Sequence, residues 1–92
     1  MQRLEINYRG ARLALEFDTS PAARLKVNGI VREHVRSDQL PITLKLTSTV
    51  QTDYEWHEFI EGLVIYSETG VRASLIANSQ ELASEEFPRE IT

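Results

Sequence analysis

Apolar and polar residues alternate along much of this chain, and this alternation limits the fold more than any other feature of the sequence. The clearest case is residues 42–50, where Ile42, Leu44, Leu46 and Val50 would share one face. A period of two is typical of a β-strand that buries one face. The sequence therefore predicts a protein rich in β-sheet.

Turn signals between the alternating segments predict hairpins. Asn28-Gly29 is the strongest, because both residue types tolerate the positive φ of a two-residue hairpin turn. Such a turn would pair Val27 with Ile30 and Arg24 with Glu33. We expect an antiparallel sheet of about six or seven strands, with hairpins near 3–17, 24–36, 42–50 and 63–77. Segments 25–29 and 75–79 look alike, but they are too short to establish a repeat.

The spacing of large apolar residues predicts a helix near 53–61, packed on one face of the sheet. Trp56, Phe59, Ile60 and Leu63 recur at i, i+3, i+4 and i+7. A strand would instead put Glu58 among the aromatic residues. The sequence also allows a short C-terminal helix near 80–87. The expected fold is α+β, and the alternative is an all-β sandwich or barrel.

A resemblance points to the alternative. The Val27-Asn28-Gly29 turn within a series of short strands resembles β-sandwich modules such as the Fas apoptotic inhibitory molecule family. The resemblance covers one turn and the strand count, and it implies an all-β sandwich. The helix expected near 53–61 argues against it.

The length of 92 residues predicts a single domain over 1–88, followed by a frayed tail at 89–92. Because the chain has no cysteine, disulfides, thiolate metal ligands and a cysteine nucleophile are excluded. The longest uninterrupted apolar run is far shorter than a membrane helix needs. We therefore expect a cytoplasmic protein without a membrane segment.

The net charge of −4 conceals an uneven distribution. Residues 1–46 carry eight basic and five acidic side chains, whereas residues 47–92 carry two basic and nine acidic ones. Nucleic acid is disfavoured as a partner, because the pI is about 5.1 and the basic half lacks stacking aromatics between Phe17 and Tyr54. The charged residues proposed as an interaction surface are Arg24, Lys26, Arg32, Arg36, Glu55 and Glu58.

One short segment contains residues suited to catalysis. On a helix, His57 and Glu61 would lie one turn apart and could share a metal, with Glu58 beside them. These three residues are the catalytic candidates, and His57 and Glu61 are the metal-ligand candidates. The site would need a further ligand, so a solvated helix face is the favoured interpretation. We expect no cofactor.

These observations favour a non-enzymatic protein-interaction module whose partner is another protein or a second copy of the chain. One alternative is a small metal-dependent enzyme that uses His57, Glu58 and Glu61. Another is a small-ligand-binding protein with a cavity between the sheet and the helix.

Overall fold

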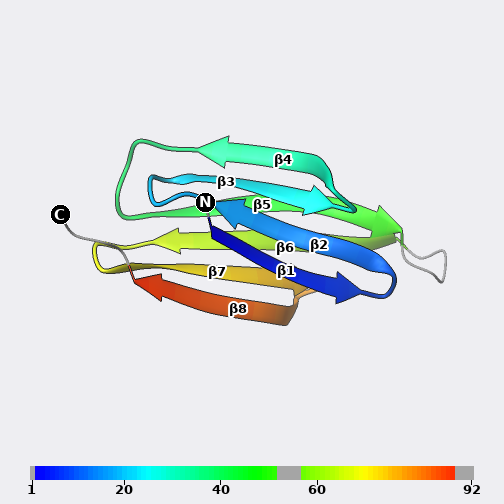
Figure 1. The fold of residues 1–92 in the computed structure, drawn as a ribbon. Helices are drawn as coiled ribbons and strands as arrows, with labels where there is room; N and C mark the ends of the chain where they lie inside the picture. The colour runs from blue at the N-terminus through cyan, green and yellow to red at the C-terminus, as the bar shows by residue number, and fades with distance from the viewer. Residues whose placement is uncertain (1, 52–56, 89–92) are drawn as a thin grey trace.

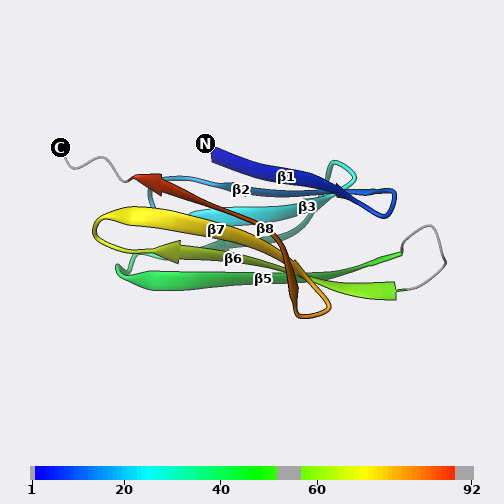
Figure 2. The ribbon, with the colours of Figure 1, turned by 90° about the horizontal axis from the view of Figure 1, so that it is seen from below.

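Two four-stranded antiparallel sheets make up the fold, and the chain completes one before it begins the other (Figure 1). The computed structural model describes residues 2–51 and 57–88, which form eight strands. Sheet A consists of β1 (Gln2–Tyr8), β2 (Ala11–Phe17), β3 (Ala22–Val27) and β4 (Ile30–Arg36). Sheet B consists of β5 (Ile42–Gln51), β6 (His57–Tyr66), β7 (Gly70–Ala77) and β8 (Gln80–Pro88). Figure 2 shows the sheets as two stacked layers, so the molecule is a β-sandwich.

The α+β prediction is wrong, because the described part of the predicted helix, residues 57–61, belongs to strand β6. Residues 53–56 of that helix lie outside the described residues. In β6, Ile60, Val64 and Tyr66 point into the core, while Phe59 and Ile65 lie on the outer face. Apolar residues on both faces of a strand imitate helical spacing, which explains the wrong prediction. The alternative, an all-β sandwich, is the observed fold.

The prediction of a short C-terminal helix is also wrong, since residues 80–87 belong to strand β8. Asn78 and Ser79 have φ values of 49° and 69°. A helix N-cap needs an extended φ, whereas a tight hairpin turn requires the left-handed region. The pair therefore turns the chain from β7 directly into β8.

The core lies between the two sheets and is filled by their inward-facing side chains. Leu13, Leu15, Leu25, Leu46, Ile60, Val64 and Leu75 are all fully buried. Gly62 lets the sheets approach closely, because a Cβ at this position would lie 2.8 Å from Leu15 Cδ1. Tyr66 also joins the layers, since its hydroxyl donates to the Asp18 carbonyl oxygen at 2.7 Å.

The two sheets repeat one structural device at an offset of 50 residues. Asn28 and Asn78 both have positive φ, and the Oδ1 of each accepts a backbone N–H, from Arg12 and Phe59 respectively. The strand after each turn contains a bulge with one extra residue, Arg32 in β4 and Leu82 in β8. The similar segments 25–29 and 75–79 therefore occupy equivalent places.

The first bulge also corrects a predicted pairing. Val27 faces Ile30 as expected, but Arg24 faces His34 instead of Glu33. The extra residue shifts the register of every later pair by one position.

Among the described residues there is no helix with the length and apolar character that a membrane crossing requires. The predicted tail at 89–92 lies outside the described part of the chain.

Candidate functional site

The outer face of sheet A carries most of the positive charge of the described chain. Alternation along each strand directs the core residues inward and the intervening residues outward. We call this surface the basic face. Its charged members, taken across the four strands, are Arg3, Glu5, Arg12, Glu16, Arg24, Lys26 and Arg36. Five cations therefore share the surface with two carboxylates.

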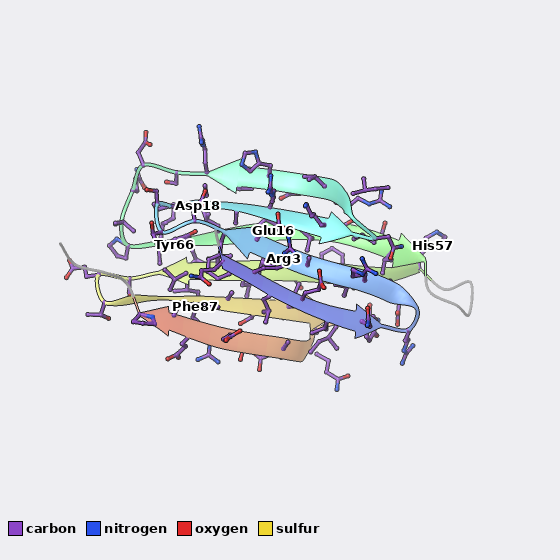
Figure 3. The ribbon with its side chains drawn as sticks, viewed as in Figure 1. Arg3, Glu16, Asp18, His57, Tyr66 and Phe87 are labelled. Atoms are coloured by element: carbon purple, nitrogen blue, oxygen red, sulfur yellow. The ribbon has the colours of Figure 1, made fainter. Side chains whose placement is uncertain are left out.

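Glu16 lies at the centre of the basic face and is only 2% exposed. The strand register sets it opposite Arg3 on β1 and Arg24 on β3. Arg3 donates to Oε2 through Nε at 2.9 Å and contacts it through Nη2 at 2.8 Å. Arg24 Nε donates to Oε1, and Lys26 Nζ lies 3.3 Å from the same oxygen. Figure 3 shows Arg3 and Glu16 side by side over β1 and β2.

The charges around Glu16 determine its ionisation. Burial, the largest single influence, raises the pKa of Glu16, but the hydrogen bonds and charges of Arg24, Lys26 and Arg3 together outweigh it. The pKa therefore lies below its ordinary value. An ionised Glu16 neutralises one of three cations and fixes the positions of all of them. The cluster is thus a pre-organised surface with surplus positive charge.

A hollow of about 130 Å³ opens on the basic face beside Glu16. Ala14 lies between Glu5 and Lys26 on the neighbouring strands, and its methyl group is much shorter than the side chains around it. The residues that line the hollow are Arg3, Glu5, Arg12, Ala14, Glu16, Lys26 and Gly29.

The residues predicted to form one interaction surface lie in different parts of the molecule. Arg24, Lys26 and Arg36 lie on the basic face, and Arg32 is the extra residue of the β4 bulge. Glu55 lies outside the described residues. Glu58 is 5% exposed and points between the sheets, so it is not part of an exposed surface.

Glu58 belongs to a polar cluster at one end of the sandwich. Its Oε1 accepts hydrogen bonds from Tyr8 Oη at 3.0 Å, Arg9 Nη1 at 3.0 Å and Asn78 Nδ2 at 3.2 Å. Its Oε2 is buried and has no hydrogen-bond partner within the described part of the chain. Burial raises the pKa of Tyr8 above its ordinary value, and the hydrogen bond to Glu58 raises it further. This cluster joins β1, β6 and the β7–β8 turn.

The strand at β6 separates the residues of the predicted metal site. His57 and Glu61 lie on one face about 13 Å apart, from a rise of roughly 3.3 Å per residue, while Glu58 points to the other face. Glu61 forms an ion pair with Lys45 at 3.2 Å. Within residues 2–51 and 57–88, no cluster of three or more His, Cys, Asp or Glu side chains could hold a metal ion. The helical spacing behind the metal hypothesis is therefore absent.

The outer face of sheet B has a different character. Phe59 and Ile65 on β6 are 43% and 41% exposed. A hollow of about 500 Å³ lies near the β6–β7 turn and is lined by residues of β6, β7 and β8, among them Ile65, Arg72, Glu86 and Phe87. The expected ligand cavity between sheet and helix has no counterpart in the described chain, because residues 57–61 and 80–87 are strands.

Comparison with protein-family models, curated proteins and solved structures finds no match.

Glu16 and Ala14 are the residues that the sequence interpretation missed. Both belong to the predicted 3–17 hairpin, yet their neighbours on β3 depend on the register between β2 and β3. A Glu at the outward position of a strand that also carries apolar residues could have signalled a cross-strand ion pair. The sequence does not give that register, since the loop between Phe17 and Ala22 is not a two-residue hairpin.

Proposed function

We propose that this protein is a non-enzymatic interaction module that binds an acidic protein surface through the basic face of sheet A. The observation that carries the proposal is the Glu16 cluster, in which one buried carboxylate holds Arg3, Arg24 and Lys26 in place. Because these side chains are already ordered, binding costs less side-chain entropy than it would with free lysines and arginines.

The surplus charge supports an acidic partner. Five cations and two carboxylates leave the basic face positive, although the whole chain has a net charge of −4. Complementary potentials steer association and select the partner. We propose the cytoplasm as the compartment, which suits a chain without cysteine.

A protein partner is favoured over nucleic acid. Single-stranded nucleic acids are bound by positive grooves that also offer aromatic side chains for base stacking. The outward positions of β1–β4 contain no Phe, Tyr or Trp. The basic face offers charge without a stacking platform.

A second copy of the chain is a specific candidate for the acidic partner. Strand β8 lies at the edge of sheet B and has exposed Glu81, Glu85 and Glu86. A contact between β8 of one copy and the basic face of another would weaken with salt. Measurement of the mass in solution at low and high salt tests this version, and a monomer at high concentration and low salt would contradict it.

Titration with a blocked hexaglutamate peptide tests the proposed function itself. We expect binding that weakens as salt is added, because the cations of the basic face are partly exposed and open to screening. The double variant Arg24→Gln/Arg36→Gln should bind roughly tenfold more weakly, which corresponds to about 0.7 kcal/mol for each lost charge.

The matched control is Lys45→Gln/Arg72→Gln, which removes two basic residues from the outer face of sheet B. It should leave the affinity unchanged. Equal losses in both double variants would mean that only net charge matters, and this result would exclude a specific basic face. A hexathymidylate that binds more tightly than the peptide would favour nucleic acid instead.

A further inference from the structure

We infer that the hollow over Ala14 is a subsite for one side-chain carboxylate of the acidic partner. This inference rests on the proposed function, because it names the group that the basic face recognises. The hollow has a volume of about 130 Å³, the space of roughly four water molecules. That volume accommodates a carboxylate together with bridging water.

Arg12 supplies the free donor of the subsite. It lies two residues before Ala14 on β2, so its side chain leaves the same face of the sheet. It is exposed and forms no ion pair with any residue in the described ranges. A guanidinium without an anion can bind an incoming carboxylate through two parallel hydrogen bonds.

Glu16 holds the other two cations of the hollow in place. Lys26 lies directly across from Ala14 and contacts Glu16, and Arg3 is bound to the same carboxylate. Because Glu16 restrains both, neither can fold over the hollow without losing its ion pair. The hollow therefore stays open while its walls remain positively charged.

The charge of the lining selects the class of anion. Arg3, Arg12 and Lys26 oppose Glu5 and Glu16, which leaves one net positive charge around the hollow. A single carboxylate neutralises this charge. A phosphate dianion would exceed it, and the two nearby carboxylates would repel a dianion more strongly than a single carboxylate.

Binding of blocked hexaglutamate to two variants tests the subsite. Ala14→Val fills the floor of the hollow with a residue that favours strands and leaves the charge unchanged. Arg12→Gln removes the free donor on the surface, where folding is little affected. We expect each variant to bind about tenfold more weakly, equivalent to the loss of one charge-assisted hydrogen bond. Thr47→Val, on the outer face of sheet B, is the matched control and should bind like the unchanged protein.

The other outcomes show whether the subsite alone, or the proposed function as well, is wrong. If Ala14→Val and Arg12→Gln bind normally while Arg24→Gln/Arg36→Gln binds weakly, the subsite is wrong and the proposed function stands. If the unchanged protein does not bind hexaglutamate, both are wrong. If a peptide with phosphoserine in place of one glutamate binds tenfold more tightly, the subsite prefers phosphate and the assignment to carboxylate fails.

Discussion

Two buried glutamates carry most of the polar chemistry of this sandwich, and they are held in different ways. Both oxygens of Glu16 are paired with cations on an outer face. Glu58 lies between the sheets, with three donors on Oε1 and none from the described residues on Oε2. Glu16 therefore holds cations in place on the surface, whereas Glu58 links β1, β6 and the β7–β8 turn at one end of the core.

The effect of substituting Glu16 on stability should depend on pH, because Glu16 stabilises the fold in its ionised form. The folded-state pKa of Glu16 lies below the ordinary value of 4.5, so its stabilisation is complete above that value and disappears as pH falls through the folded-state pKa. Glu16→Gln should cost about 2 kcal/mol of unfolding free energy at neutral pH, because hydrogen bonds to a charged group are lost. Urea denaturation of both proteins, from neutral pH to below the folded-state pKa of Glu16, measures the difference in unfolding free energy.

The control for this experiment is Glu5→Gln on the same face, which is exposed and should change stability by no more than about 0.5 kcal/mol. A cost for Glu16→Gln that stays constant from neutral to acid pH would show that shape, and not charge, is responsible.

Glu58 also explains where interpretation of the sequence failed at the residue scale. A glutamate at an inward strand position contradicts the usual burial pattern, so a helix sorted the residues of 53–61 better. Its partners come from Tyr8, Arg9 and Asn78, which are 20 or more residues away in sequence. No local pattern could identify them. Violations of a local rule of this kind often mark a special site.

At the scale of elements, the hairpins could be predicted from the sequence, but a strand in place of the predicted helix could not. The Asn28-Gly29 turn, the strand near 42–50 and the hairpin around residue 70 follow from turn chemistry and alternation. Gly62 lies in the middle of β6 against Leu15. Such a close approach between sheets depends on tertiary packing, which sequence periodicity does not contain.

The Asn28 and Asn78 turns should respond differently to the same substitution. Aspartate keeps the Oδ1 acceptor that both turns use. Asn28→Asp should therefore change stability by less than about 0.5 kcal/mol. Asn78→Asp loses the donor to Glu58 and sets a second carboxylate beside it, so it should cost about 2 to 3 kcal/mol. Thermal unfolding compares the two, and equal effects would contradict the Glu58 cluster.

Gly62→Ala tests the close approach of the sheets. The new Cβ would lie 2.8 Å from Leu15 Cδ1 in a fully buried setting, so we expect a loss of about 1 to 3 kcal/mol. Leu15→Val creates space at the same contact. The double variant should be more stable than the sum of the single effects predicts, and strict additivity in denaturant unfolding would refute the contact.

At the scale of the whole molecule, one backbone arrangement presents two different surfaces. The equivalent turns and bulges of the two sheets give matched outer faces, yet β2 and β3 display Arg12, Glu16 and Lys26 where β6 and β7 display Phe59, Leu63 and Ile76. The uneven charge of the two halves was visible in the sequence. That the halves form separate sheets was not, because it depends on which strands pair.

The proposed function requires sheet A to bind an acidic protein through its outer face. Titration of the isotope-labelled protein with blocked hexaglutamate, followed through backbone amide NMR shifts, tests it most directly. We predict that shifts concentrate on β1, β2 and β3 around Ala14 and Glu16 and fade as salt is added, while β5 and β6 remain unchanged. Shifts spread evenly over both sheets, or confined to sheet B, would contradict the account.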